Sequence, residues 1–238
     1  MYDQFVMAIR VDNTYNMPYK FVGKLFYDRG RDFFGFSQSY YGTAFMISDS
    51  AIITAAHNIY DFKKKKFSKR YRFKPAYNNR LAPFGHWKAV SHYIPEAWLQ
   101  NGSASYDYGI IVLENKGFEN IGTFLGGRFE ITRSVPQYNT LWTDVGYPSN
   151  IDCGRNMCFQ VGSFAGIVSL NNESHVWSLM SNNMHAGSSG GPWILDIESD
   201  SWIANGIHVG RVKVQGNERT YSPPITEETM EFVHDALQ

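Results

Sequence analysis

Short runs of apolar residues, separated by glycine, asparagine and serine, dominate the pattern of this chain. Aromatic and β-branched residues are frequent in these runs, and long helical periodicity is nearly absent, which is typical of β-strands. The predicted strands include the segments YKFVGKLFY, TAFMIS, AIITAA, GIIVLE, GIVSL and WIANGIHVG. The pattern therefore predicts an all-β body.

The C-terminal segment PPITEETMEFVHDALQ is the clear exception to the strand pattern. Thr226 is suited to cap the N-terminus of a helix, and the two glutamates that follow it favour the positive end of the helix dipole. Met230, Val233 and Leu237 would share one apolar face of that helix. We therefore predict a terminal helix over 226–238 that closes the β body.

The chain has 238 residues, which is enough for one large β domain or two small lobes. The segment LENKGFENIGTFLGGRFE, residues 113–130, is the best candidate for a connection between two halves. We divide the chain into an N-terminal unit over 1–115, a connection over 116–130, a C-terminal unit over 131–225 and the helix over 226–238.

The composition is globular, with 43% hydrophobic and 18% charged residues. Lys+Arg and Asp+Glu are balanced at 22 each, so no overall field favours nucleic acid or a membrane. No apolar run has the length that spans a bilayer, and no glycine-rich phosphate loop or RNA-binding aromatic signature is present. We expect neither a nucleic-acid partner nor membrane insertion. The N-terminal segment lacks a basic-then-apolar signal pattern, so any export signal is missing from this chain.

Cysteine and histidine are sparse and predict no metal centre. Cys153 and Cys158 form a single C-x4-C pair that could at most staple one short loop. The histidines outside the candidate site show no metal-ligand spacing. We expect no metal and no cofactor. The histidines in question are His86, His92, His175 and His234.

One charge run stands out: DFKKKKFSKRYRFK, residues 61–74, contains eight basic residues. It could form a patch for an acidic substrate, a nucleic acid or an anionic surface. It could also be a solvated loop and strand edge, where lysine discourages edge-to-edge pairing. The zero net charge of the chain favours the second interpretation.

The residues for nucleophilic serine catalysis occur in suitable local contexts. Such catalysis needs a nucleophile, a base, an acid group that orients the base, and N–H donors for the oxyanion. His57 follows the apolar run AIITAA, and Asp107 precedes the buried-looking strand GIIVLE. The segment HAGSSGGP offers Ser189 as the nucleophile and the N–H groups of Gly187 and Ser189 as oxyanion donors. Each piece alone is weak, but the three together predict a serine hydrolase.

The segment GSSGG also fits the G-x-S-x-G elbow of α/β-hydrolases. That elbow must run from a strand into a helix. Here Pro192 follows and leads into an apparent β-hairpin, and the crossover helices of a parallel sheet are lacking. The elbow interpretation is therefore rejected.

The chain resembles the glutamyl endopeptidases, a secreted branch of the chymotrypsin-like serine proteases. The likeness runs from about residue 10 to the C-terminus, and the order His, Asp, Ser matches. It is carried by RVDNTYNMPYKFVGKL, GTAFMISDSAIITAAHNIYD, YIPEAWLQNGSASYDYGIIVL, VGYPSN, GSSGGP, GIHVG and ITEETMEFV.

The resemblance implies two six-stranded antiparallel barrels with the active site in the cleft between them. It assigns catalysis to His57, Asp107 and Ser189 and the oxyanion hole to the N–H groups of Gly187 and Ser189. It further implies polypeptide substrates, a secreted location and a monomer.

Three positions depart from the wider chymotrypsin-like pattern. Ser188 replaces the aspartate that pairs with a freed N-terminus in trypsin-type zymogens, so that activation switch should be absent. Gly42 and Asn58 stand where the cysteines of the usual disulfide beside the catalytic histidine would fall.

Specificity follows from the resemblance as well. His208 matches the family histidine that helps to bind a glutamate at P1, the residue before the cleaved bond. Met184 replaces a small hydroxyl residue of that pocket, and Arg211 could add charge at its mouth, where a bidentate arginine would suit a carboxylate. His185 borders the same pocket. We expect a preference for Glu, extending to Asp, at P1.

Two other functions remain open at this point. Met184 could reshape the pocket into an apolar one, which would give a protease of the same fold with a non-acidic P1 preference. The chain could also be a binding or toxin-like module that hydrolyses little, although the intact candidate residues argue against it.

Overall fold

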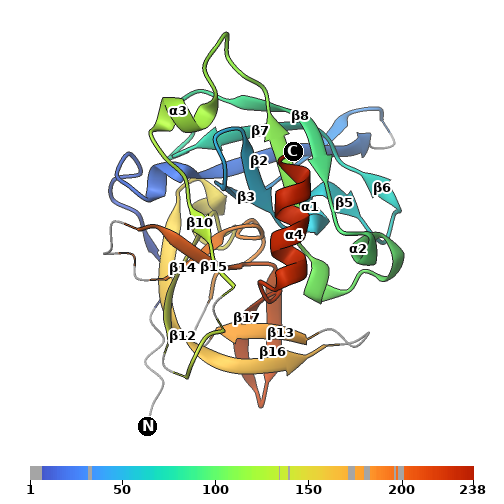
Figure 1. Ribbon diagram of the computed structural model, residues 1–238, viewed down its shortest axis with the longest axis vertical. Helices are drawn as coiled ribbons and strands as arrows, with labels where there is room; N and C mark the ends of the chain where they lie inside the picture. The colour runs from blue at the N-terminus through green and yellow to red at the C-terminus, as the bar shows by residue number, and fades with distance from the viewer. Residues whose placement is uncertain are drawn as a thin grey trace.

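The structure is a computed structural model with two β-rich halves (Figure 1). It describes residues 7–31, 34–133, 135–138, 140–170, 175–179, 183–195, 197 and 201–238, and only the backbone of Arg31 and Cys153. The predicted all-β body with a C-terminal helix is confirmed.

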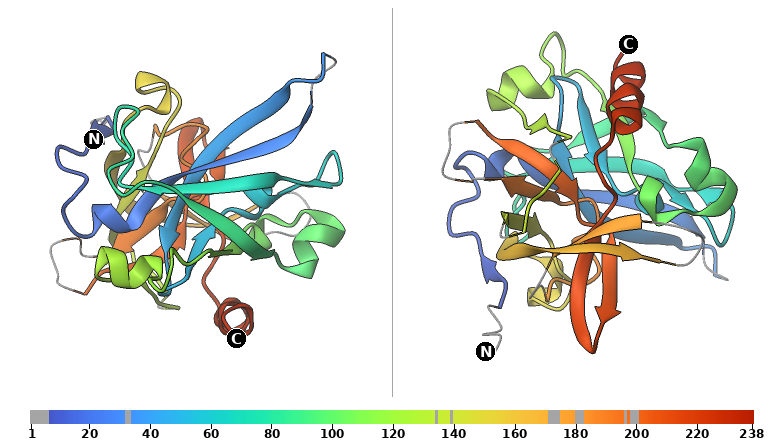
Figure 2. Two further views of the ribbon diagram at one scale, coloured as in Figure 1. Left: turned by 90° about the horizontal axis from the view of Figure 1, so that it is seen from above. Right: turned by 60° about the horizontal axis from the view of Figure 1, so that its bottom comes forward.

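Six antiparallel strands of the N-terminal half close into a barrel, as predicted. Buried aliphatic and aromatic side chains, including Leu25, Phe45 and Ile111, fill its interior. The β2–β3 hairpin extends beyond the barrel (Figure 2). Around the barrel the strands are β2 (Val22–Arg31), β3 (Ser37–Met46), β4 (Ala51–Thr54), β9 (Gly109–Leu113), β8 (Trp87–Tyr93) and β7 (Lys69–Pro75).

The C-terminal half is built on a curled sheet. The Ile207 N–H donates to Ser222 Oγ at 2.8 Å, and the Val209 N–H donates to the Tyr221 carbonyl at 3.1 Å, so β15 and β17 meet. The stacked and tilted rings of Trp142, Trp177 and Trp193 lie in its core. In order, the strands are β10 (Glu130–Ile131), β15 (Ile203–Ile207), β14 (Pro192–Leu195), β11 (Leu141–Gly146), β12 (Cys158–Ser169), β13 (His175–Leu179), β17 (Asn217–Ser222) and β16 (Gly210–Val214).

Each end of the chain contacts the opposite half of the molecule. Strand β1 (Ile9–Arg10) pairs with β12 of the C-terminal half, although the predicted N-terminal unit 1–115 included it. Helix α4 (Glu227–Ala236) contacts the N-terminal half, where the Phe232 ring packs edge-on against Tyr108 at 5.5 Å between centroids. Figure 1 shows α4 beside the elements of the N-terminal half. Sequence patterning is local and does not show such pairings.

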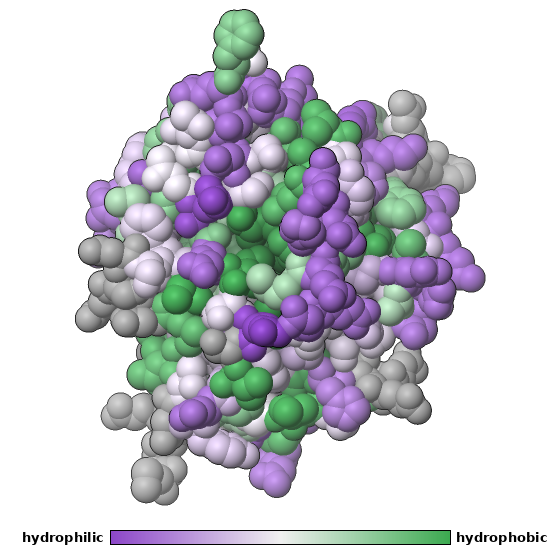
Figure 3. Space-filling view, in the orientation of Figure 1, coloured by the Kyte–Doolittle hydropathy of each residue, from purple (hydrophilic) through white to green (hydrophobic). Residues whose placement is uncertain are grey.

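The predicted helix α4 begins as expected. Thr226 Oγ1 accepts from the Thr229 N–H at 3.3 Å, and Thr229 Oγ1 accepts from the Thr226 N–H at 3.1 Å, which forms a capping box. Met230 and Val233 pack against the core as predicted, whereas Leu237 lies beyond the last helical residue and is 39% exposed, and Ala236 is buried instead. The outward side of α4 is hydrophilic (Figure 3).

Short elements connect the strands. The predicted connection contains α3 (Ile121–Leu125), which Asn120 caps through its side chain. The other elements are η1 (Tyr19–Phe21), α1 (Ala56–Ile59), β5 (Tyr60–Asp61), β6 (Lys66–Phe67), α2 (Glu96–Asn101), η2 (Ala104–Tyr106) and η3 (Asp152–Gly154). In the described part of the chain, no helix has the length and apolarity needed to cross a membrane.

The basic run lies on the outside of the barrel. Along β7, exposed Arg70 and Arg72 alternate with buried Tyr71 and Phe73, as expected of a strand with one solvated face. Because β7 pairs with both β2 and β8, the predicted strand edge is wrong, although the solvated side chains are as expected.

Candidate active site

His57 and Asp107 come together because two paired strands deliver them to the same place. Strands β4 and β9 are antiparallel, with Thr54 opposite Gly109, so the residue after one strand lies near the residue before the other. His57 lies in α1, which follows β4, and Asp107 follows η2 and precedes β9 by two positions.

The Asp107 carboxylate holds His57 at two points. Its Oδ2 lies 2.7 Å from His57 Nδ1, and its Oδ1 accepts from the His57 backbone N–H at 2.9 Å. The Asp107 side chain is 6% exposed and the His57 side chain 31% exposed. A proton on Nδ1 donates to Asp107, which leaves Nε2 for another partner.

The loop that carries Ser189 is tied to the same place. The Ser189 carbonyl oxygen accepts from the Thr43 N–H at 2.8 Å and from Asn58 Nδ2 at 2.9 Å. Because Asn58 follows His57 in the chain, these bonds place Ser189 beside α1. The structure thus brings together the three residues predicted from the sequence, His57, Asp107 and Ser189.

Glycines allow this loop to curl. Gly187 has φ +97°, and a Cβ there would lie 2.5 Å from Tyr41 Cε2. Gly190 has φ +93°, and a Cβ there would collide with the carbonyl oxygen of Thr43. Among the described residues, the N–H groups of Gly187 and Ser189 have no acceptor. These two donors are therefore available to a ligand.

Asn58, at a position where the resemblance leads one to expect a cysteine, supports the site with hydrogen bonds. It is 1% exposed and accepts from the Tyr27 hydroxyl at 2.9 Å. Its amide donates to Thr54 Oγ1 at 2.9 Å as well as to Ser189. A Cβ on Gly42 would lie 2.8 Å from Asn58 Cγ, so the amide needs a glycine opposite it.

His208 is buried and paired with an aspartate that the sequence reasoning missed. Its Nδ1 lies 2.7 Å from Asp144 Oδ2, and the two side chains are 2% and 0% exposed. The His208 carbonyl accepts from the Gly190 N–H at 2.6 Å, and the His208 N–H donates to the Gly191 carbonyl at 2.8 Å. The available signal was a lone aspartate within the apolar strand LWTDVG, which needs a partner when buried.

Arg211 and His185 meet near the loop that carries Ser189. Arg211 Nη1 lies 2.9 Å from His185 Nε2 and 2.9 Å from Glu218 Oε2. Burial and, secondly, the nearby Arg211 lower the pKa of His185, which favours the neutral ring that accepts from the guanidinium. Met184, which precedes His185, is fully buried. Arg211 is therefore held by its neighbours at this point of the surface.

The remaining candidate groups add no chemistry to this site. Cys158 is a buried free thiol, and burial raises its pKa to about 11. Ser188 is fully buried next to Ser189. Within the described ranges, no group of histidine, cysteine and carboxylate side chains could hold a metal ion.

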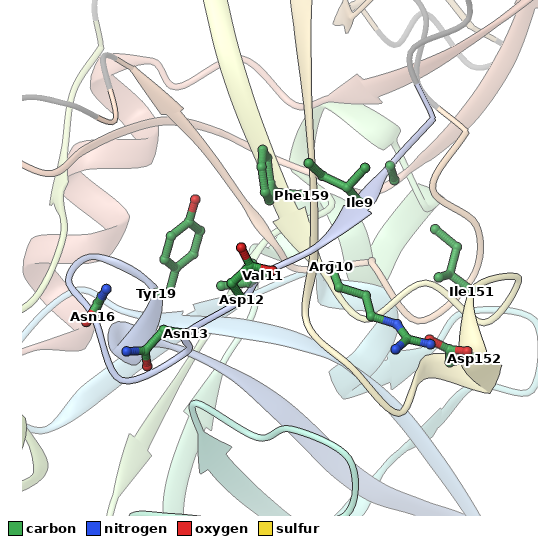
Figure 4. Close-up of a pocket in the computed structure, with 11 residues that line it drawn as sticks. Ile9, Arg10, Val11, Asp12, Asn13, Asn16, Tyr19, Ile151, Asp152 and Phe159 are labelled. Carbon is green, nitrogen blue, oxygen red and sulfur yellow. The ribbon is translucent and has the colours of Figure 1, made fainter.

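A cavity of about 710 Å³ lies away from these residues, between the N-terminal segment and the β11–β12 connection (Figure 4). Tyr19 and Phe159 line one part of it, and Arg10 forms an ion pair with Asp152 at another. None of the residues that line it belongs to the predicted site.

Comparison with known proteins gives sequence relatives and closely similar folds. No protein-family model matches the chain. A glutamyl endopeptidase of Bacillus licheniformis is 30% identical over 145 residues, which cover 61% of this chain and 41% of that protein. An extracellular metalloprotease of Bacillus subtilis is 23% identical over 115 residues, covering 48% of this chain and 35% of that protein. The chain thus spans less than half the length of these relatives.

Three solved structures share the fold. The thermostable serine protease AL20 from an extremophilic microorganism has a TM-score of 0.76 at 23% identity, covering 91% of this chain and 96% of its own. The protease Anisep from Arthrobacter nicotinovorans has a TM-score of 0.75 at 22% identity, with coverages of 91% and 95%. A Glu endopeptidase in complex with MPD has a TM-score of 0.76 at 19% identity, with coverages of 97% and 96%.

The sequence similarity and the shared fold agree with each other and with the resemblance found in the sequence motifs. The chain is similar in sequence to a glutamyl endopeptidase and has a chymotrypsin-like fold, which it shares with solved serine proteases.

Proposed function

We propose that the chain is a serine endopeptidase in which Ser189 is the nucleophile, His57 the general base and Asp107 the residue that orients His57. The observation that carries this proposal is the doubly anchored His57–Asp107 pair beside a loop whose Ser189 carbonyl is fixed by Thr43 and Asn58. The sequence relationship to a glutamyl endopeptidase supports it.

In the proposed reaction, Ser189 Oγ attacks the scissile carbonyl carbon and its proton moves to His57 Nε2. The free N–H groups of Gly187 and Ser189 donate to the oxyanion that forms. When the C–N bond breaks, His57 returns the proton to the leaving amine. A water molecule, activated in the same way, then hydrolyses the acyl-enzyme. Asp107 holds the ring tautomer and stabilises the imidazolium in both halves of the reaction.

We further propose that the enzyme prefers an acidic residue, chiefly Glu, at P1. His208 follows β15 and is hydrogen-bonded through its backbone to Gly190 and Gly191, which places it next to the nucleophile. A carboxylate removed from water needs compensating donors, and a histidine ring can supply an N–H or a positive charge.

Met184 supports a second candidate specificity. It is fully buried in the same loop and offers no hydrogen bond to a carboxylate. If it lines the pocket, the enzyme would prefer an apolar P1 residue while keeping the same catalytic residues.

The catalytic assignment is tested by the variants Ser189→Ala and His57→Ala. Either should remove essentially all turnover of a peptide substrate, because the triad acts as a unit. Ser188→Ala is a matched control, since it removes a neighbouring hydroxyl to which we assign no chemical role. Wild-type protein should also react with a serine-directed phosphonylating reagent, which a mere binding module would not do. Wild-type activity in Ser189→Ala would refute the mechanism.

The P1 proposal is tested with a proteome-derived peptide library. Cleavage after Glu, with less after Asp, is the expected result. Cleavage after Leu or Phe and none after Glu would instead support the apolar pocket.

A secreted location is also part of the proposal, supported by the resemblance to a secreted family. Detecting the active protein in the culture medium of its source would test it, and retention of all activity in washed cells would contradict it.

A further inference from the structure

The buried Asp144–His208 pair has no role in the catalytic steps given above. Asp144 lies on β11 and is fully buried, and its Oδ2 is 2.7 Å from Nδ1 of an equally buried His208. We propose that Asp144 is a positioning residue for substrate specificity, which orients His208 and compensates the charge of a ring bound to Glu, so that His208 distinguishes Glu from Gln at P1. This inference rests on the acidic-P1 part of the proposed function.

The first step of the argument concerns the orientation of the ring. A proton on His208 Nδ1 donates a hydrogen bond to the Asp144 carboxylate, which sets the tautomer and directs Nε2 away from Asp144. The backbone of His208 is held by hydrogen bonds in both directions to Gly190 and Gly191. The ring is thus anchored to β11 through Nδ1, and the backbone of the same residue is anchored to the loop of Ser189.

The second step concerns what Nε2 can offer a substrate. With Nδ1–H held by Asp144, a singly protonated ring presents a lone pair at Nε2, which would accept a hydrogen bond from the amide N–H of Gln. A doubly protonated ring presents an N–H and a positive charge, which suit the carboxylate of Glu. The negative charge of Asp144 compensates that positive charge inside the protein. The pairing with Asp144 is therefore suited to a ring that binds Glu.

The third step concerns the other charge near this loop. Arg211 contacts both His185 and Glu218, and the Glu218 carboxylate lies 2.9 Å from its Nη1. Its charge is therefore largely compensated before a substrate binds. Recognition of a P1 carboxylate then depends on His208, and through His208 on Asp144.

The experiment compares two peptide substrates that differ only in Glu or Gln at P1. The ratio of their kcat/KM values is measured for wild type, for Asp144→Asn and for the control Asp49→Asn. Asp49 is an exposed aspartate whose ion pair with Arg128 lies on the surface. Because both substrates meet the same enzyme sample, the ratio does not depend on how much of a variant is folded.

We expect wild type and Asp49→Asn to prefer Glu by roughly one to two orders of magnitude. Asp144→Asn should reduce this preference to about threefold or less, since its neutral amide no longer compensates a charged ring. Its reaction with a serine-directed phosphonate should persist, because Ser189, His57 and Asp107 are unchanged.

If wild type prefers Glu and Asp144→Asn keeps the whole preference, the role of Asp144 is wrong while the proposed function stands. If wild type shows no preference for Glu, both this inference and the acidic-P1 proposal fail, and phosphonate reactivity still reports on the catalytic residues separately.

A measurement on wild type covers the case in which Asp144→Asn does not fold. In ¹⁵N NMR of the histidine rings, a phosphonate inhibitor with a Glu side chain at P1 should leave His208 protonated on both nitrogens. The matching Gln inhibitor should leave Nε2 unprotonated. An unprotonated Nε2 in the Glu complex would overturn the inference.

Discussion

Asn58→Ala tests whether the hydrogen bonds of the Asn58 amide stabilise the fold and the site beside His57. The amide has three partners, each at 2.9 Å: the Tyr27 hydroxyl, Thr54 Oγ1 and the Ser189 carbonyl oxygen. Alanine removes all of them without introducing a bulky group.

The expected loss in the free energy of unfolding depends on which hydrogen bonds each partner of Asn58 retains in the variant. The Ser189 carbonyl still accepts from the Thr43 N–H at 2.8 Å, and the Thr54 hydroxyl still donates to the Thr43 carbonyl at 2.7 Å. These two lost bonds should cost about 1 kcal/mol each. The buried Tyr27 hydroxyl loses its described partner, which adds ~1–3 kcal/mol. The free energy of unfolding should therefore fall by about 3–5 kcal/mol relative to wild type.

Urea unfolding of wild type, Asn58→Ala, Tyr27→Phe and the double variant measures this loss and the contribution of the bond between Asn58 and Tyr27. The double-mutant cycle should give a coupling of about 1 kcal/mol between Asn58 and Tyr27. In peptidase assays, kcat should fall more than KM rises, because the main chain of Ser189 loses one of its two anchors. A total loss below about 1 kcal/mol, or additive effects of the two substitutions, would refute this reasoning.

Three further predictions concern the loop of Ser189, a buried lysine and the cap of α4. Gly190→Ala should abolish most peptidase activity, measured as kcat/KM, because its φ of +93° and the closeness of the Thr43 carbonyl leave no room for a Cβ. Burial, and to a smaller extent the charge of Lys74, lower the pKa of Lys24 to about 8. Above that pH the unfolded chain therefore binds more protons than the folded chain does. The unfolding free energy of wild type should thus rise relative to Lys24→Met as pH increases from about 8 towards 10.5, in paired urea titrations. Thr226→Ala should lower the thermal stability by ~1 kcal/mol through loss of the helix cap, measured by calorimetry.

The candidate residues that could be found from the sequence lie where strands end. His57 and Asp107 each adjoin an apolar run, and a polar residue at such a position either turns the chain or faces a cleft. The glycines around Ser189 likewise reflect backbone geometry that only glycine adopts easily. These signals are local, so a single chain reveals them.

What the sequence could not reveal depends on contacts between distant segments. Asp144 and His208 are far apart in the chain, and only the folded sheet brings their side chains to 2.7 Å. The pairing of β1 with β12 is of the same kind. In α4 only Leu237 departs from the predicted apolar face: it continues the apolar spacing of Met230 and Val233, yet the helix ends before it at Ala236.

The exchange of chain ends between the halves affects how the protein responds to a break in its backbone. The β1 strand belongs to the C-terminal sheet, and α4 contacts Tyr106 and Tyr108 of the N-terminal half. Each fragment of a chain cut within 116–120 would still carry a segment that docks on the other fragment. A single nick there would therefore leave one particle rather than two, and the protein would behave as intact until denatured.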